Sequence, residues 1–280
     1  MSKFDRWVKL RPLALPTAMW VSMWFRKMKL ARALAAETLG TAFLLATVVG
    51  SGALADKLDL GNLAVSVLCV AFATGAVLIA LIAAFGSVSA HFNPIVSLVC
   101  ALRGEFKWKL VAPYIVAQLA GAILGVVVAN LMFDLPAFTI STTARSGMGQ
   151  WLGEFVASFG LIGIILGSAR SNSNSGIAVP AYVAGAIYFT SSTCFANPAV
   201  TIARIFTNTL TGILPADVPA FIASQLAGAL CAAFVFGWLF AAEGSEEHTL
   251  AGQDIEEKRV GELKPEVFAN LERELAAANK

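Results

Sequence analysis

Charge is scarce in this sequence. Only 14% of its 280 residues are Asp, Glu, Lys or Arg, whereas soluble domains carry about 25%. Five stretches hold no charged residue at all: 60–102, 110–133, 155–169, 171–203 and 218–242. With 58% hydrophobic residues and a mean hydropathy of +0.74, the composition excludes an ordinary soluble domain and indicates a chain embedded in a lipid bilayer.

Residues used in catalysis or metal binding are also few. The chain has two histidines, His91 and His248, and it contains no HExxH or GxSxG motif. The four cysteines lack metal-ligand spacing: Cys69, Cys100, Cys194 and Cys231. We therefore expect no catalytic residue, no metal and no cofactor, which argues against a membrane-embedded enzyme. No nucleic-acid partner is expected either.

The apolar stretches predict an all-α membrane protein. A membrane-spanning helix needs roughly 20 mostly apolar residues. Six segments meet this need, at about 32–52, 63–84, 108–131, 149–169, 176–192 and 217–241. They form one membrane domain over residues 31–242, between an N-terminal segment, 1–30, and a charged tail, 243–280.

The basic residues predict the orientation. If the N-terminus is cytoplasmic, 17 of the 20 Lys and Arg residues fall on the cytoplasmic side, and only Lys57, Arg145 and Arg204 fall outside. Such an excess is usual for cytoplasmic connections, and an even number of spans puts both termini on one side. We therefore expect a multi-pass protein of the cell (inner) membrane with both termini cytoplasmic.

Two terminal segments have their own patterns. Residues 13–25 form an apolar patch that is too short to span, so it is predicted to lie at the membrane interface with Trp20 and Trp24 at headgroup level. A signal peptide fits less well, because "RKMK" follows where small cleavage-site residues belong. In the tail, Pro265 begins a sequence typical of a short amphipathic helix.

The two halves of the membrane domain repeat each other. "AHFNPIVSLV" (90–99) resembles "CFANPAVTIA" (194–203), and each is followed by "QLAG". A span with a lone acid precedes each copy, with Glu37 in the first and Glu154 in the second.

Each repeat, about 31–133 and 149–241, has three predicted spans. Because three is odd, the second repeat begins on the opposite side of the membrane and is inverted. Inverted repeats place paired binding elements near the middle of the bilayer. The Asn-Pro segments are therefore predicted to be half-helices that enter the membrane and return.

The Asn-Pro pairs suit the start of such a half-helix. Its first backbone N–H groups have no partner within the helix, and the side-chain oxygen of Asn93 or Asn197 can accept from them. Pro94 and Pro198 have no N–H to leave unpaired. Two inverted starts would meet at mid-membrane, each with roughly +0.5 charge from its helix dipole. This arrangement repels cations and favours uncharged, hydroxyl-bearing solutes.

These features together resemble the aquaporin, or major intrinsic protein, family over residues of about 31–242. The similarity rests on the two Asn-Pro boxes, "SAHFNP", Glu37, Glu154 and the doubled "QLAG". It implies six spans, two half-helices, a pore in each protomer, a homotetramer and passive flow of small neutral solutes. It also makes Asn93 and Asn197 the donors in the pore, and it makes Glu37, Glu154 and His91 structural supports of the half-helix loops.

The sequence departs from this family in both boxes. The first reads Asn93, Pro94, Ile95, with Ile in place of the usual Ala, and its bulk either shifts the half-helix or narrows the pore. The second reads Asn197, Pro198, Ala199, and Val200 follows where the family usually has Arg. Counting back from the boxes without gaps completes the predicted selectivity filter: Ala73, Gly185, Cys194 and Val200. A slip of one residue would put Thr74 in place of Ala73.

This filter is small and apolar, so the pore is predicted to be wide and to pass solutes larger than water. Cation exclusion is then expected to rest more on the half-helix dipoles. Arg204 lies one helical turn after Val200. It either reaches back to replace the missing Arg in part or, as favoured here, lies at the outer rim.

The segments "NPAVTIAR" and "PADVPAFIASQLAGA" also resemble a bacterial subgroup associated with arsenic-resistance operons. The predicted function is therefore a passive channel for water, glycerol-like polyols and neutral metalloid hydroxides such as arsenite. One alternative is a mainly water-selective channel. Another is a coupled secondary transporter, for which only Glu37 and Glu154 are available as ionisable groups within the membrane.

Overall fold

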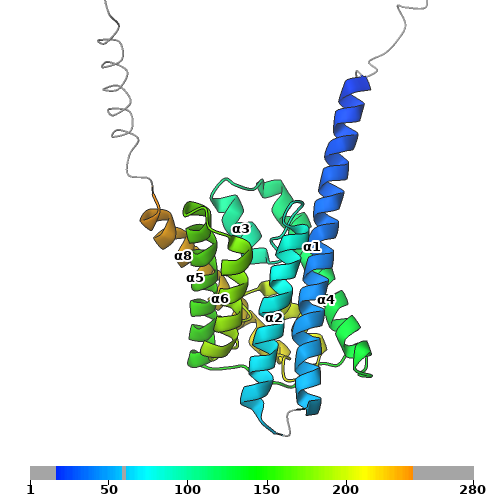
Figure 1. Ribbon diagram of the computed structural model, residues 1–280, viewed down its shortest axis with the longest axis vertical. Coiled ribbons are helices and arrows are strands. Elements are labelled where there is room, and N and C mark those ends of the chain that lie inside the picture. Colours follow the sequence, from blue (N-terminus) through cyan, green and yellow to red (C-terminus); the bar gives the residue numbers. More distant parts are fainter. Residues whose placement is uncertain (1–16, 59–60, 242–280) are drawn as a thin grey trace, which may run out of the picture. The chain divides into compact units, whose positions relative to one another are not determined.

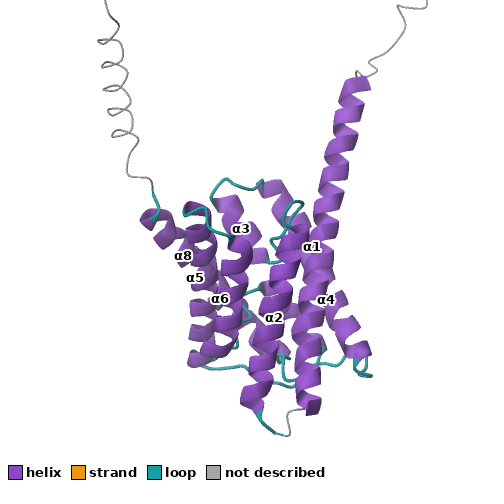
Figure 2. Ribbon diagram, in the orientation of Figure 1, coloured by secondary structure: helices purple, strands orange, loops and turns teal. Residues whose placement is uncertain are grey.

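The computed structural model describes residues 17–58 and 61–241, where all regular elements are helices (Figures 1 and 2). Residues up to Trp238 form one compact unit. Its long helices are α1 (Thr17–Leu58), α2 (Leu63–Phe85), α4 (Trp108–Met132), α5 (Met148–Arg170) and α8 (Val218–Leu239). Shorter elements are α3 (Pro94–Leu102), α6 (Ser175–Phe189), α7 (Pro198–Ala203), and the 3₁₀ turns Arg204–Phe206 and Pro215–Asp217.

The predicted spans correspond to helices, as expected where lipid offers no hydrogen-bond partner to the backbone. In the described part of the chain, five helical segments are long and apolar enough to cross a membrane: Lys29–Leu58, Leu63–Phe85, Trp108–Met132, Met148–Arg170 and Pro215–Leu239. The remaining predicted span, 176–192, is the 15-residue helix α6, which ends at Phe189.

The helix α1 begins before the predicted first span. Residues 17–25 of the supposed interfacial patch continue into the first span as one helix. The physical reason is that no Gly or Pro occurs between Thr17 and Leu39 to end it. The rest of that patch, and the predicted tail helix at Pro265, lie outside the described residues.

The half-helices begin as the Asn-Pro pairs predict. Asn93 and Asn197 have extended backbones and precede α3 and α7 as their N-caps, with Pro at the first helical position. The Asn93 side-chain oxygen accepts from the amide of Ile95 at 3.1 Å. That of Asn197 accepts from Ala199 at 3.0 Å and Val200 at 3.3 Å.

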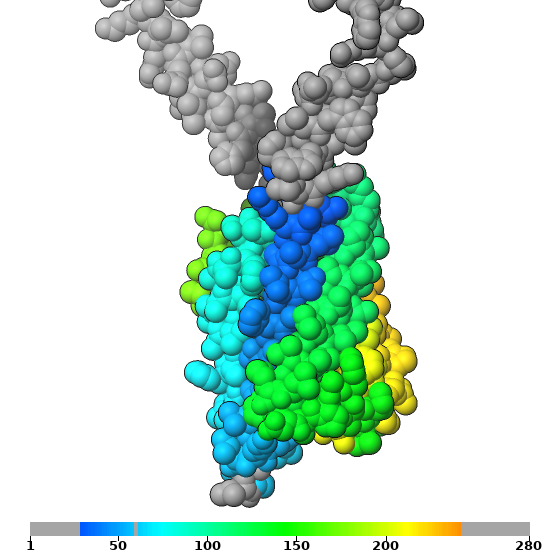
Figure 3. Space-filling model, turned by 90° about the vertical axis from the view of Figure 1, so that its right-hand side faces the viewer, coloured from blue at the N-terminus to red at the C-terminus, as the bar shows by residue number. Residues whose placement is uncertain are grey.

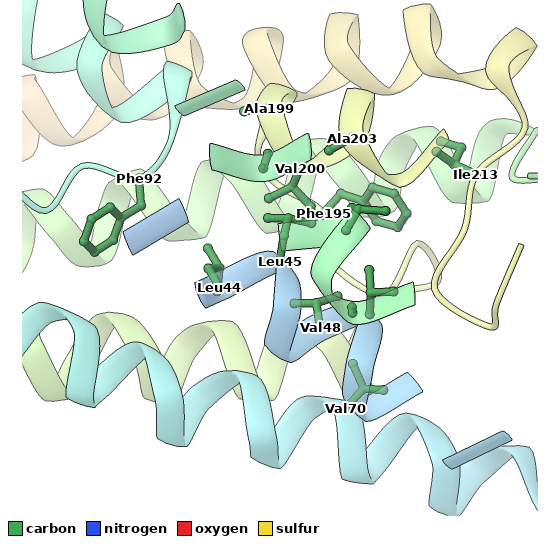
Figure 4. Close-up of a cluster of buried hydrophobic side chains, with 14 of the residues drawn as sticks. Leu44, Leu45, Val48, Val70, Phe92, Phe195, Ala199, Val200, Ala203 and Ile213 are labelled. Atoms are coloured by element: carbon green, nitrogen blue, oxygen red, sulfur yellow. The ribbon is translucent and has the colours of Figure 1, made fainter. Parts of the chain in front are cut away.

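The long helices enclose these half-helices. α1 lies between α2 and α4 (Figure 3), and α6 packs on both α2 and α5. The half-helices α3 and α7 each pack on α4 and also meet each other. The principal hydrophobic cluster joins Leu45 and Val48 of α1 to Phe195 and Val200 at the second box (Figure 4). The packed interior therefore surrounds the two Asn-Pro boxes.

Candidate functional site

The two asparagines are linked across the boxes. The Asn93 side-chain amide donates to the carbonyl of Ala196 at 2.7 Å, and that of Asn197 donates to the carbonyl of Phe92 at 2.8 Å. Both asparagines are buried. A side-chain amide has two N–H groups, so this pairing leaves one on each asparagine for a solute. The asparagines predicted as donors in the pore are therefore each partly engaged by the opposite box.

The residue before each asparagine has an unusual backbone. Phe92 has φ of 49° and Ala196 has φ of 45°, a left-handed conformation that costs non-glycine residues about 1 kcal/mol or more. This conformation directs each carbonyl toward the opposite asparagine. The amide of Phe92 donates to Glu37 at 2.7 Å and that of Ala196 to Glu154 at 2.9 Å, so the buried acids hold the strained loops.

Glu37 of α1 is fully buried and accepts four hydrogen bonds. Its Oε1 accepts from the Ser89 hydroxyl at 2.6 Å and from the His91 amide at 2.8 Å. Its Oε2 accepts from the Phe92 amide at 2.7 Å and from the Gln118 side chain at 2.8 Å. Such saturation explains how a carboxylate lies within a membrane domain without a cation beside it.

Glu154 of α5 repeats this arrangement. Its Oε1 accepts from the Phe195 amide at 2.8 Å, and its Oε2 accepts from the Ala196 amide at 2.9 Å and from the Gln225 side chain at 2.5 Å. The two carboxylates thus bind the loops that lead into the two half-helices.

The glutamines of the two "QLAG" segments tie each acid to its half-helix. Gln118 also donates to the Ser97 hydroxyl at 3.1 Å, and Gln225 donates to the Thr201 hydroxyl at 2.8 Å. Sequence reasoning used these glutamines only as markers of the repeat and did not assign this role. The signal that would have found them was their recurrence in both halves, each in a span that follows an acid-bearing span.

One cavity of about 570 Å³ contains both asparagines and the residues on either side of them. At one end it is lined by His91, Phe106 and Tyr114, and at the other by Arg145, Leu210 and Thr211. Between these ends the lining is mostly aliphatic, from α1, α2, α5 and α6. The cavity therefore offers polar groups at its ends and at the asparagines, and hydrocarbon elsewhere.

His91 lies at one end of the cavity. Its Nδ1 is 2.9 Å from the Ser97 hydroxyl, and its ring packs against those of Phe106 and Tyr114. The imidazole thus connects the loop before the first box to α3, while its backbone amide is bound by Glu37.

The predicted filter positions are only partly on the cavity. Cys194 and Val200 line it, as does Thr74 in place of Ala73. The Thr74 side chain is 2% exposed and its hydroxyl has no hydrogen-bond partner in the described protein. Counting back from the first box without gaps therefore misses the cavity-lining residue of α2 by one position. The sequence analysis named this alternative, with Thr74 in place of Ala73.

The predicted filter position on α6 needs a larger correction. Gly185 is exposed on α6 and is not part of the cavity lining. The cavity face of α6 is made by Val179, Val183 and Ile187, which recur every fourth residue on one side of the helix. Gly185 lies two residues from Val183 and two from Ile187, which is about half a helical turn and therefore places it on the other side.

The other box residues face away from this cavity. Pro94, Ile95, Pro198 and Ala199 line a separate apolar cavity of about 280 Å³ together with residues of α4 and α8. Ile95 is fully buried there. Its bulk therefore fills space behind the half-helices and does not narrow the passage.

The sequence favoured a place for Arg204 at the outer rim. In the structure Arg204 is instead only 4% exposed and lines the cavity. Its guanidinium lies over the Phe195 ring, 3.4 Å from the ring centroid. Arg145 lies near the same ring, at 4.9 Å, and sequence reasoning missed it as a site residue. Burial lowers the pKa of Arg145 to about 10, so it remains a cation at neutral pH.

The model of the family described as "Major intrinsic protein" matches residues 24–193 of this chain. The chain belongs to the major intrinsic protein family. It is 48% identical over 215 residues to "Aquaglyceroporin AqpS" of Rhizobium meliloti, covering 75% of this chain and 91% of that protein. It is 31% identical over 217 residues to "Probable aquaporin NIP-type" of Nicotiana alata, covering 72% of this chain and 76% of that protein.

A solved structure agrees with the fold. The X-ray structure of the aquaglyceroporin from Plasmodium falciparum matches with a TM-score of 0.58 and 21% identity, covering 76% of this chain and 96% of that one. Membership of a family of channels confirms the sequence-based expectation that the chain is not an enzyme. It also fits a cavity in which the repeated motifs hold backbone loops instead of assembling a reacting group.

Proposed function

We propose that this protein is a passive channel for small neutral solutes, including water, glycerol-like polyols and metalloid hydroxides such as arsenite. The observation that carries the proposal is the single cavity containing both Asn-Pro caps and Val200. Asn93 and Asn197 each keep an N–H for a solute, and Val200 occupies the place where the family usually has Arg.

The lining explains a preference for neutral solutes. A charged solute would lose most of its hydration among aliphatic side chains, at a cost that one remaining N–H on each asparagine does not offset. An uncharged hydroxyl compound loses much less and accepts hydrogen bonds from those groups. With Val at position 200, no guanidinium narrows the passage at that position, so we expect solutes larger than water to enter there.

The polyol and metalloid parts of the proposal rest on relatives and on sequence resemblance. A relative of 48% identity is named an aquaglyceroporin, which supports glycerol as a solute. The segments after the second box resemble channels associated with arsenic-resistance operons, which supports neutral trivalent hydroxides. Such hydroxides are uncharged at neutral pH and carry hydroxyl groups as polyols do.

The assembly and orientation are part of the same proposal. We infer a homotetramer with one pore in each protomer, in the cell (inner) membrane, with both termini cytoplasmic. The exposed apolar side chains on the long helices, such as Phe72, Leu152 and Phe234, supply surface for lipid and for neighbouring protomers. The distribution of Lys and Arg supports the orientation, which places the Arg145 end of the cavity outside.

Stopped-flow light scattering on proteoliposomes tests the function. The expected result is rapid uptake of glycerol and arsenite, together with water flow, independent of proton or sodium gradients. Fast osmotic shrinkage without glycerol or arsenite uptake would instead identify a water-selective channel. Uptake that requires an ion gradient would identify a coupled transporter. Empty liposomes provide the baseline.

A further inference from the structure

Two buried arginines lie at the same end of the cavity. Arg145 comes from the connection between α4 and α5, and Arg204 follows the second half-helix. Their guanidinium carbons are 4.9 Å and 3.4 Å from the ring centroid of Phe195. Both arginines line the cavity and are less than a tenth exposed. Two guanidinium groups from distant parts of the chain therefore lie beside the same Phe195 ring.

One loop holds both side chains in this place. Arg145 donates from Nε to the carbonyl of Gly212 at 2.7 Å and from Nη2 to that of Leu210 at 2.9 Å. The Nε of Arg204 donates to the carbonyl of Thr211. Three successive carbonyls thus fix two guanidinium groups, and Arg145 acts as a positioning residue for the loop that also holds Arg204.

No carboxylate neutralises this pair within the described residues. The one ion pair found there joins Arg103 and Glu105, on the exposed surface. Asp217 accepts from the backbone amide of Arg145. The other nearby acid, Glu154, is engaged by the loop of the second box. The pair therefore places two guanidinium groups on the cavity without a carboxylate in direct contact, although Glu154 and Asp217 lie near enough to interact electrostatically.

The two arginines differ in their remaining donors. The Nη groups of Arg145 donate to protein oxygens of Ser192, Thr193 and Leu210. For Arg204, the described protein supplies a hydrogen-bond acceptor only to Nε. Because the side chain borders the cavity, its terminal N–H groups are available to a passing solute.

We propose that Arg204 is the specificity-determining cation of this pore. On this assignment, which rests on the proposed function, it replaces the Arg that the family usually has at position 200. Four residues further along, the charge lies about one helical turn, roughly 6 Å, nearer the Arg145 end. The side chain at position 200 can then stay small, which leaves the pore wide there. Arg204 repels cations and donates to neutral hydroxyl-bearing solutes.

The assignment is tested on purified channels in proteoliposomes by measuring sodium and potassium leak alongside glycerol uptake. Arg204→Leu removes both charge and donors, and Arg204→Gln removes the charge but keeps an N–H donor. We expect both to raise the cation leak about tenfold or more, because a charge beside the passage is lost. Arg204→Lys keeps the charge and should stay as cation-tight as the wild type.

Lys57→Leu is the matched control, because it removes an exposed basic residue assigned to the same side of the membrane and outside the cavity. Its cation leak and glycerol uptake should equal those of the wild type. The double variant Val200→Arg, Arg204→Leu moves the charge by one turn. It should restore cation exclusion but lower glycerol uptake severalfold, by about 5-fold for roughly 1 kcal/mol of added barrier.

Folding is monitored by gel filtration and melting temperature. A folded Arg204→Leu or Arg204→Gln channel that takes up glycerol normally and stays cation-tight would overturn the assignment, and exclusion would then rest on the half-helix starts. If Arg204→Leu does not fold, Arg204→Gln decides by the same criterion. Absence of glycerol uptake by the wild type would instead contradict the proposed function.

Discussion

Gly121 of α4 lies so close to Thr38 of α1 that a β-carbon on the glycine would be 2.2 Å from the Thr38 carbonyl oxygen. Gly228 of α8 repeats this contact with Phe155 of α5, at 2.3 Å. Thr38 and Phe155 are the residues directly after the buried acids, and the glycines end the two "QLAG" segments. The close approach of the helices therefore lets each glutamine reach its acid.

Gly121→Ala is expected to destabilise the protein, because the added methyl group meets backbone and cannot be relieved by a side-chain movement. Overpacking of this kind costs about 1–3 kcal/mol, seen as a lower melting temperature in detergent. Gly149→Ala is the control, because a β-carbon there would meet nothing within 4 Å and alanine favours the helix. Equal melting temperatures for the two variants would contradict the close-packing argument.

Glu37→Gln should lower both stability and solute uptake. The carboxylate accepts from four donors, and a glutamine presents an NH₂ group to some of them. Leaving buried amides unpaired costs about 2–4 kcal/mol, and the first-box loop would lose its fixed conformation. Thermal unfolding and glycerol uptake are the measurements. Glu105→Gln, which breaks only an exposed pair with Arg103, should change neither.

Asn93→Ala should weaken the junction of the two boxes. The variant loses the cap on the Ile95 amide and the hydrogen bond to the Ala196 carbonyl. Loss of an N-cap alone costs about 0.5–2 kcal/mol, so the melting temperature and glycerol uptake should both fall. Asn208→Ala, in an exposed loop, is the comparison. An Asn93→Ala channel with normal uptake would remove this amide from the transport path.

Thr74→Val separates transport from stability. Thr74 lines the cavity, and its buried hydroxyl has no partner in the described protein, so replacement of the hydroxyl by a methyl group should not lower the melting temperature. If solutes bond to this hydroxyl, water and glycerol uptake should fall by about 5-fold, the equivalent of roughly 1 kcal/mol. Ala73→Val changes the neighbour that does not line the cavity and should leave uptake unchanged.

A mercurial should block the channel through Cys194, which lines the cavity at the second box. Cys100 also borders the cavity, whereas Cys69 and Cys231 are exposed elsewhere. The informative background therefore carries Ser at all three of these other positions. We expect the mercurial to block glycerol uptake by this triple-serine channel. The block should disappear when Cys194→Ser is added. Persistent block without Cys194 would remove this residue from the filter.

The helical elements and the two boxes were predictable from local sequence. Uncharged runs of sufficient length give helices in lipid, because the backbone must bond to itself. Asn and Pro in sequence begin a helix because one caps its free amides and the other has none to leave free. These effects act over a few residues and need no knowledge of the rest of the chain.

The filter positions and the arginines depend on distant contacts. Gly185 was misplaced because a gap-free count fixes distance along the chain, whereas the side of α6 that faces the cavity depends on how that helix packs on α2 and α5. Arg145 carries no local signal, because a basic residue in a connection is common. Its place beside Phe195 arises from carbonyls of the loop at Leu210 and Gly212.

The sequence alone determined that this chain crosses the bilayer as an inverted repeat with two capped half-helices, because hydrophobic length and capping chemistry are written in neighbouring residues. The tertiary structure alone decided that Gln118 and Gln225 tie the acids to those half-helices and that Arg204 is buried beside Arg145. Such pairings join residues far apart in sequence, and only packing brings them together.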